Sequence, residues 1–379
     1  MPRDGDSRRA AATAARRRLV RARFSAMPAA RFALYRLIRP IVQAPLAGGP
    51  STPALAAAVS EAGGLGFLAA GYKRVDDVAD EIVAVRAATR RPFGLNLFVP
   101  SGQPADDATV APYVAALRTE AERHGVALGE PRHDDDGWQQ KLTLVHELRP
   151  DVVSFTFGCP SGEQIAALHA DGIAAWVTIT TPDEARTAAA AGADALVVQG
   201  AEAGGHRGTF DDAAPAAIGL LALLQLVTAA VEPPLVGAGG VMNGAGVAAA
   251  LAAGARAVQL GSAFMLTPEA GTSAPHRAAL AAPGDTVLTR AFSGRTARGI
   301  VNRFLAEHDE GAPRAYPEVH HLTAPLRAAA RERGDADALN LWAGQAHELA
   351  EAVPAGDIVR RLADDARDAL RVAAERAGA

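Results

Sequence analysis

The stretch AAWVTITTPDEARTAAAAGADALVV, residues 174–198, contains one complete unit of the repeat that decides the fold. Its first part, Ala174–Ile179, is almost uniformly apolar, as is typical of a strand covered on both faces. A helical segment follows at 182–191, and Ala191-Gly192-Ala193 supplies the glycine that suits a helix C-terminus. The next apolar run, Ala195–Val198, begins another unit. Strand, helix and strand in this order predict a parallel βαβ unit.

The same alternation covers most of the chain. Further helical segments lie at 53–62, 76–89, 162–171, 215–231 and 243–253. Eight such units predict a closed (β/α)8 TIM barrel. A doubly wound open sheet is the alternative, but no GxGxxG pattern follows the first strand. The eight candidate strands are Ile41–Ala44, Gly64–Leu68, Phe93–Phe98, Val152–Phe155, Ala174–Ile179, Ala195–Val198, Leu235–Gly237 and Ala257–Gly261.

Two long segments interrupt the repeat, at about 100–140 and 267–350. The first contains a candidate helix, Val110–His124, and the acidic run Asp134-Asp135-Asp136. Both segments follow strands, so in a barrel they are insertions at the C-terminal face, where they form lids or pocket walls. The last segment, Ala355–Ala377, predicts a charged amphipathic helix on the outside of the barrel.

Composition excludes several classes of protein. The 379 residues carry a net charge of −4 and a single cysteine, Cys159. A disulfide framework and a cysteine-rich zinc site are therefore excluded, and no overall basic field indicates nucleic acid. The longest apolar stretch, Pro215–Val231, is interrupted by Gln225 and Thr228 and is too short to span a membrane. We expect a cytoplasmic monomer or homodimer that binds neither nucleic acid nor membrane.

The first 39 residues differ from the rest. They contain eleven arginines and two aspartates, hence nine net positive charges. This composition favours a disordered basic extension, residues 1–39, ahead of a barrel domain at 40–379. A nucleic-acid or membrane arm and an organelle presequence are the alternatives. A secretory signal is not expected because no apolar core is present, and Met27 is a second candidate start.

The ends of the first and third strands carry candidate ligand contacts. The first ends in Gln43-Ala44-Pro45-Leu46-Ala47-Gly48-Gly49, where glycine lets the backbone approach a flat ligand closely. The third contains Asn96, a lone amide in an apolar strand. Asn96 is either a core amide with internal partners or a hydrogen-bonding group for a heterocycle or phosphate.

The sixth strand ends in the most informative motif, Gln199-Gly200-Ala201-Glu202-Ala203-Gly204-Gly205-His206-Arg207-Gly208. Small residues surround one imidazole and leave room for a ligand beside it. His206 can act as a base or as an electrostatic partner near neutral pH. A lone histidine is more often structural, but a position after a barrel strand favours function.

Glycine-containing loops also follow the last two strands. The seventh is followed by Gly239-Gly240, and the eighth gives Gln259-Leu260-Gly261-Ser262. Loops at these two places form the usual phosphate site of a barrel, and neither contains the GK[ST] of an ATP-binding loop. No histidine pair with ligand spacing predicts a metal, and no G-x-S-x-G elbow predicts a serine hydrolase. Cys159 at the end of the fourth strand is a less favoured nucleophile, because no base adjoins it in sequence.

Taken together, these motifs resemble those of the nitronate monooxygenases, formerly called 2-nitropropane dioxygenases. The resemblance spans roughly residues 40–350 and includes Gln43–Gly49, Gly94–Phe98, Asp151–Gly158 and Gln199–Gly208. The run from Tyr316-Pro317 through Leu322-Thr323-Ala324-Pro325-Leu326-Arg327 to Leu341-Trp342-Ala343-Gly344-Gln345 resembles class I in particular. One departure is Leu46, which stands where the family usually has methionine after the proline.

The resemblance implies a metal-free FMN enzyme that oxidises alkyl nitronates with dioxygen to a carbonyl compound and nitrite. Propionate 3-nitronate is the typical class I substrate. His206 is then the catalytic residue, either protonated to hold the nitronate or neutral to take the α-proton of a nitroalkane. The implied contacts to the isoalloxazine or ribityl chain are Ala44, Pro45, Leu46, Asn96, Gln199 and Gly204, and those to the phosphate are Gly239, Gly240, Gln259, Gly261 and Ser262.

Three further positions have competing interpretations. Lys141 resembles a flavin contact, with a solvated helix residue as the alternative. Tyr316 is expected to wall the substrate pocket. His320 or His321 adds positive charge there, or else both are surface loop residues.

Other functions stay open at this stage. A flavin reductase of the same fold, using NAD(P)H and reducing a quinone or an enoyl thioester, is the main alternative. A flavin-free barrel that binds a sugar phosphate and a non-catalytic flavin-binding protein are two others.

Overall fold

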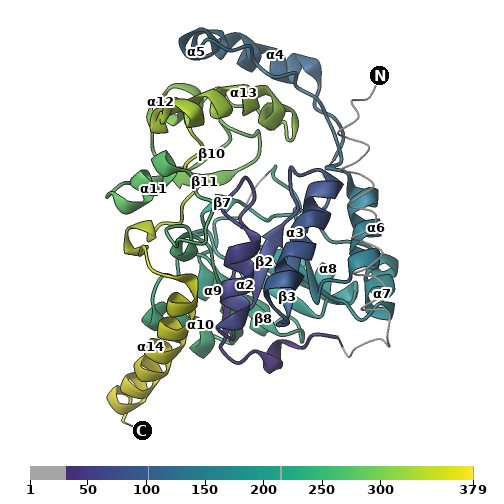
Figure 1. Ribbon diagram of the computed structural model, residues 1–379, viewed down its shortest axis with the longest axis vertical. Helices are drawn as coiled ribbons and strands as arrows, with labels where there is room; N and C mark the ends of the chain where they lie inside the picture. The colour runs from purple at the N-terminus through teal and green to yellow at the C-terminus, as the bar shows by residue number, and fades with distance from the viewer. Residues whose placement is uncertain (1–30, 101, 214–215, 379) are drawn as a thin grey trace.

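The computed structural model describes residues 31–100, 102–213 and 216–378. Eight parallel strands form its central sheet, in the order β1-β9-β8-β6-β5-β4-β3-β2 (Figure 1). A bridge between Val42 and Leu65 joins β1 to the residue before β2, so the sheet closes on itself. The predicted (β/α)8 TIM barrel is confirmed. Its strands are β1 Ile41–Gln43, β2 Gly66–Ala69, β3 Phe93–Phe98, β4 Val152–Thr156, β5 Ala174–Ile179, β6 Ala195–Gln199, β8 Leu235–Ala238 and β9 Ala255–Leu260.

Helices cover the outside of this barrel. Several begin where the sequence supplies a cap: the side chain of Thr52 accepts from the Leu55 N–H, and that of Thr181 from the Glu184 N–H, each with proline following. The predicted C-terminal helix contacts α10 and α2 and so occupies the place of the eighth barrel helix. The barrel helices are α2 Pro53–Glu61, α3 Val75–Ala88, α6 Trp138–Leu148, α7 Gly162–Ala170, α8 Pro182–Ala190, α9 Leu220–Thr228, α10 Gly244–Ala252 and α14 Ala355–Arg376.

The N-terminal end of the barrel is closed by residues that precede β1. Leu34, in the 3₁₀ turn η1 (Leu34–Arg36), is buried against the barrel interior together with Phe32 and Leu37. The Phe32 ring lies 6.2 Å from that of Trp176, and Arg31 forms an ion pair with Asp194 at 2.7 Å. Residues 31–39, which the charge pattern grouped with the basic extension, therefore pack on the barrel. The predicted disorder of residues 1–30 lies outside the described residues.

The two insertions gather at the opposite end, where Figure 1 shows α4, α5, α12 and α13 together. The expected single helix Val110–His124 is two helices, because the chain turns at Leu117. A three-stranded antiparallel sheet in the order β10-β11-β7, which the sequence pattern did not predict, also lies here. The elements at this end are α4 Asp107–Ala116, α5 Arg118–His124, β7 Gly205–His206, η2 Ser262–Phe264, α11 Ala274–Ala281, β10 Thr286–Thr289, β11 Ala297–Ile300, α12 Arg303–His308, α13 Glu318–Arg333, η3 Ala336–Ala338 and η4 His347–Leu349.

No helix in the described part of the chain combines the length and apolarity that a membrane crossing requires.

Candidate active site

A cavity of about 620 Å³ lies at the C-terminal ends of the barrel strands. Its floor comes from the strand ends and its walls largely from the second insertion, including Ser293, His320 and Trp342. No described residue of the 100–140 insertion lines it. The cavity brings together twelve of the fourteen predicted site residues, while Lys141 and Tyr316 stand outside its lining. The twelve are Ala44, Pro45, Leu46, Asn96, Gln199, Gly204, His206, Gly239, Gly240, Gln259, Gly261 and Ser262.

The loop after β1 is held in place by two buried side chains. The Gln43 amide donates to Ser51 Oγ at 3.0 Å and accepts from the Phe67 N–H at 2.9 Å. The same Ser51 oxygen accepts from the Leu46 N–H at 2.8 Å. Gly48 and Gly49 have φ values of 84° and 130°, which only glycine adopts easily. The loop therefore presents a fixed backbone edge to the cavity.

Asn96 and Gln199 have internal partners as well as a place in the lining. The Asn96 amide nitrogen donates to Ser154 Oγ at 2.9 Å and to Thr156 Oγ1 at 3.0 Å. The Gln199 amide donates to the His206 carbonyl at 3.1 Å and accepts from the Gly208 N–H at 2.8 Å. Gln199 thus holds the histidine loop against the barrel. Their flavin contacts stay predictions.

His206 lies on β7, where it pairs with Ala297 of β11. Its Nε2 is 2.8 Å from Ser293 Oγ, and its ring packs edge-on against Trp342 at 5.5 Å. Burial, reinforced by the nearby charges of Arg295 and Arg327, lowers the pKa of His206 to about 3. The imidazole is therefore neutral at neutral pH, which favours the base over the cationic partner.

The glycine loops fit a phosphate-bearing planar group. Gly239 and Gly240 have φ values of 117° and 68°. A Cβ at Gly204 would overlap the backbone of Ala343, and one at Gly205 would meet no atom within 4 Å, so a side chain there would project into open space. Backbone N–H groups without obstruction by Cβ suit an anion. The residues present therefore fit the FMN that the sequence predicts.

Tyr72 and His320 form another part of the cavity wall. Their rings stack at 3.9 Å between centroids, and the Tyr316 hydroxyl donates to the Tyr72 hydroxyl at 3.2 Å. Burial raises the pKa of Tyr72 to about 12 and lowers the pKa of His320 well below its ordinary value. His320 is therefore a neutral wall residue on α13, and His321 points instead to Asp134 at 2.8 Å. His320 therefore brings no positive charge to the cavity, and His321 is not among the described residues that line it.

Lys141 is not the solvated residue of the alternative interpretation, because only 2% of it is exposed. Its ammonium donates to the Ala70 carbonyl at 2.9 Å and pairs with Asp136 at 2.7 Å. Asp136 also accepts from the Tyr72 N–H at 3.0 Å, and Tyr72 has a φ of 66°. The Lys141–Asp136 pair therefore supports the loop that carries Tyr72 to the cavity.

Arg327 is a cavity residue that the sequence interpretation did not place in the site. It lines the wall on α13, and Arg331 lines the cavity one turn further along. Burial lowers the pKa of Arg327 to about 10, still far above neutral pH. No aspartate or glutamate is among the described residues that line the cavity. The helical spacing of His320, Ala324, Arg327 and Arg331 on one face was the available signal.

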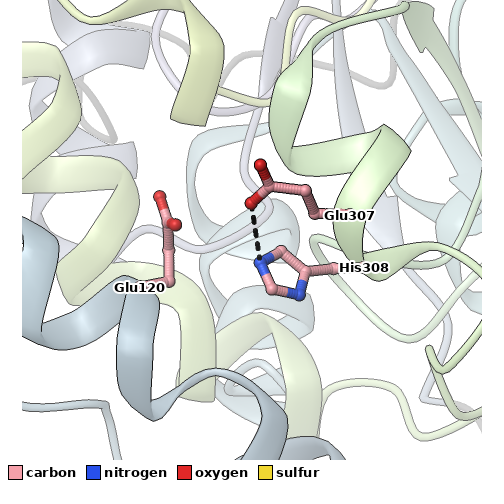
Figure 2. A group of neighbouring side chains, drawn as sticks. All are labelled: Glu120, Glu307 and His308. Atoms are coloured by element: carbon pink, nitrogen blue, oxygen red, sulfur yellow. Dashed lines mark ion pairs between the residues drawn. The ribbon is translucent and has the colours of Figure 1, made fainter.

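One cluster outside the cavity has the composition of a metal site (Figure 2). It consists of Glu120, Glu307 and His308. The Glu120 carboxylate, however, accepts from Arg303 at 2.6 and 2.9 Å, and Arg303 also bonds to Glu307 at 2.8 Å. Two guanidinium groups, those of Arg303 and Arg123, already pair with both carboxylates, so the cluster is an ion-pair network that ties α5 to α12 and not a cation site.

Cys159 does not have the surroundings of a nucleophile. Its thiol donates to the Pro160 carbonyl at 3.3 Å, and burial raises its pKa to about 11. Reactive cysteines have lowered pKa values, so this one is better explained by packing.

Comparisons with known proteins agree with this geometry. The family model described as nitronate monooxygenase matches residues 31–365. A nitronate monooxygenase of Pseudomonas aeruginosa is 42% identical over 349 residues, covering 87% of this chain and 96% of the relative. One from Paraburkholderia phytofirmans is 40% identical, covering 88% and 93%.

Solved structures give the same result. A nitroalkane oxidase from Streptomyces ansochromogenes superimposes with a TM-score of 0.86 at 52% identity, covering 89% of this chain and 98% of that one. FabK from Thermotoga maritima has a TM-score of 0.72 at 26% identity, covering 90% and 97%. The chain is an oxidoreductase that belongs to the nitronate monooxygenase family.

Proposed function

We propose that this protein binds FMN and oxidises alkyl nitronates with dioxygen, giving a carbonyl compound and nitrite. The observation that carries the proposal is a neutral histidine, His206, beside a glycine-edged cavity whose described lining contains no carboxylate. Nitronates and the FMN phosphate are both anions, and such a lining accepts both without like-charge repulsion.

The predicted cofactor contacts divide between two parts of the cavity. The loops after β8 and β9, with Gly239, Gly240, Gln259, Gly261 and Ser262, would hold the phosphate. The loop after β1 and the ends of β3 and β6 would border the isoalloxazine and ribityl chain. When bound, the flavin supplies the electron transfer and the reaction with dioxygen.

The protein's own groups act on the substrate. Arg327 supplies the positive charge that attracts the nitronate, and the ring of Trp342 helps to exclude water. His206 accepts the α-proton when the substrate is a neutral nitroalkane. In the overall reaction the C–N bond breaks and one oxygen atom enters each carbonyl. Two nitronates and one dioxygen then balance two carbonyl compounds and two nitrites.

The direct test is aerobic turnover of propionate 3-nitronate by the purified protein, with nitrite measured as product. Nitrite formation at catalytic rates supports the proposal, and its absence contradicts it. Heat should release FMN from the holoprotein, whereas FAD or no flavin would contradict the cofactor. Under anaerobic conditions NAD(P)H should not bleach the bound flavin, and rapid bleaching would favour the reductase.

A further inference from the structure

Arg295 is a buried cation close to the histidine of the candidate site. It lies in the segment between β10 and β11, and only 3% of it is exposed. No carboxylate among the described residues forms an ion pair with it, and Asp212 pairs with Arg290 instead, at 3.2 Å. The Nε atom of Arg295 is buried without a hydrogen-bond partner among the described residues. Because an unpaired buried charge is costly, Arg295 is a candidate for a role in the site.

The guanidinium of Arg295 is stacked on the ring of Phe157. Its central carbon lies 4.1 Å from the ring centroid, within the range of a cation–π interaction. One Nη donates to the carbonyl of Thr209, three residues after His206. The stack is therefore tied to the loop that carries the histidine.

Phe157 connects this cation to the imidazole. It lines the cavity with a φ of 78°, a backbone conformation that is rare for a residue with a bulky side chain. Its ring packs edge-on against His206 at 5.7 Å and against Tyr316 at 5.5 Å between centroids. Arg295 thus supports one of the rings that fix the direction of the His206 side chain.

The main chain of Arg295 reaches His206 by a second route. Ser293 Oγ, which lies 2.8 Å from His206 Nε2, accepts from the Arg295 N–H at 3.4 Å and donates to the Arg295 carbonyl at 3.2 Å. A substitution of Arg295 keeps these backbone groups. It therefore tests the stack and the charge of the side chain.

The charged groups that face His206 are all positive. After burial itself, Arg295 and then Arg327 of α13 lower the pKa of His206. Tyr316 and His320 are the other titratable groups on this side, and both are neutral near pH 7, because burial raises the pKa of Tyr316 and lowers that of His320. No carboxylate is among the described residues of the lining. The charge of Arg295 therefore opposes an imidazolium at His206.

We propose that Arg295 is a positioning residue for the reaction at His206, which fixes the imidazole through the ring of Phe157 and keeps it free to accept a proton. This role rests on the proposed function, in which His206 takes the α-proton of a nitroalkane. In that step the α-carbon–hydrogen bond breaks, the proton moves to the imidazole, and the electron pair stays on the substrate as the nitronate.

The first test measures the protonation of His206 directly. In proton–carbon NMR spectra of the holoprotein, the imidazole signal that is absent from His206→Asn identifies His206. Arg295→Met removes the charge, and the midpoint of this signal should move up by about one pH unit, the effect of one charge about 10 Å away. The change between pH 6 and pH 4 should then be clearly larger than in the wild type. Arg295→Lys keeps the charge and should titrate like the wild type.

The second test compares 1-nitropropane with its own nitronate, which has already lost the α-proton. For Arg295→Met at pH 8, kcat with 1-nitropropane should fall about 10-fold or more, because a misplaced base reacts slowly, with little change in KM. With the nitronate, kcat should change less than about 3-fold. In the His206→Asn background the same substitution should have no further effect on 1-nitropropane, since it acts through His206.

Arg86→Met is the matched control. Arg86 also lies over a phenyl ring, that of Phe93 at 5.3 Å, and neither residue lines the cavity. The control breaks a cation–π pair elsewhere in the barrel. It should leave the kinetics and the titration of His206 unchanged, whatever its effect on Tm.

Failure of this role and failure of the proposed function give different results. If neither form of the substrate is oxidised, the proposed function fails, and a raised midpoint in Arg295→Met still supports the effect on His206. If the midpoint does not move, or if Arg295→Met slows the His206→Asn enzyme as much as the wild type, the role is overturned even in an active enzyme. If Arg295→Met does not fold, Arg295→Lys decides, because it loses the flat stack on Phe157. A lowered kcat with 1-nitropropane alone supports the role, and wild-type kcat overturns it.

Discussion

The Nε2 atom of His206 lies 2.8 Å from the hydroxyl oxygen of Ser293, and this contact determines which ring nitrogen can accept a proton. The Ser293 hydroxyl donates to the Arg295 carbonyl at 3.2 Å. Its oxygen is then the acceptor for His206, so the neutral imidazole carries its proton on Nε2. This tautomer follows from the hydrogen-bond network, and it leaves Nδ1 with a free lone pair.

Replacement of His206 by asparagine should remove the base while leaving the cofactor contacts intact. Turnover of neutral nitroalkanes should fall by about 10²- to 10⁴-fold. Turnover of nitronates should fall less, because a nitronate has already lost its α-proton. The flavin content should stay near that of the wild type. His146→Asn, which changes a partly exposed histidine on α6, is the matched control. Wild-type kinetics on both substrate forms would remove His206 from the mechanism.

The lowered pKa of His206 predicts that the pH profile of kcat/KM shows no acid limb near the ordinary pKa of histidine. The group is deprotonated far below its ordinary value of 6.5, so kcat/KM for nitroalkanes should not fall as the pH drops from 8 to 5. The contribution of His206 to stability changes at lower pH. The unfolded chain binds the proton first, so this contribution is complete above about pH 6.5 and is lost as the pH falls toward about 3. His206→Asn should therefore give a shallower dependence of Tm on pH. A kinetic limb near 6.5 would contradict the assignment.

Lys141 and Lys73 are the only lysines of the chain, and their ion pairs make a matched comparison. Lys141→Met removes the cation beside Asp136, whose side chain is only 20% exposed, and should cost about 1–3 kcal/mol of unfolding free energy. Lys73→Met breaks a more exposed pair with Glu81 and should cost about 0–1 kcal/mol. Because Asp136 bonds to Tyr72, only Lys141→Met should also raise KM. Denaturant titration and steady-state kinetics measure both effects, and equal effects of the two variants would refute this role.

The residues before β1 should stabilise the barrel without touching the site. Leu34 is 6% exposed and its neighbour Tyr35 is 82% exposed. Leu34→Ala should lower the unfolding free energy by about 2–5 kcal/mol, whereas Tyr35→Ala should change it by about 0.5 kcal/mol or less. Flavin content and kcat should be unchanged in both. Identical thermal denaturation curves for the two variants would show that the packing of residues 31–39 contributes no stability.

Cys159 should be chemically inert. With a pKa of about 11, its reactive thiolate fraction at pH 8 is on the order of 10⁻³. Iodoacetamide should label the folded protein slowly at pH 8 and quickly after denaturation. Cys159→Ala should retain full nitronate turnover, and its inactivation would restore the nucleophile hypothesis.

The barrel was predictable because each unit carries its own local signals. Thr181-Pro182 begins a helix, Gly192 follows its end, and β5 and β6 are apolar on both faces. Strand ends of a parallel barrel meet at one face, so their positions along the chain are enough to group His206, Asn96 and Gly239. At most of these places the observed bounds of the strands and helices differ from the predicted bounds by only a few residues.

The insertions were less predictable, because their contacts are non-local. The pairing of His206 with Ala297 joins residues far apart in sequence, and β7 is too short to show any periodicity. Lys141 looked like a solvated or flavin-binding residue because its partner, Asp136, stands in an acidic run typical of exposed loops. Arg327 was hidden for a similar reason, since arginine on a helix is usually on the surface.

The described cavity lining, which contains two arginines and no carboxylate, also affects the release of product. Nitrite, the product of the proposed reaction, is a small planar anion like the substrate's head, so the arginines that favour entry also slow its departure. Accumulating nitrite should compete with the nitronate, so the rate should decrease along each progress curve. Added salt should weaken this inhibition by screening Arg331, which is exposed. The sustained rate in a cell then depends on how quickly nitrite is removed by whatever consumes it.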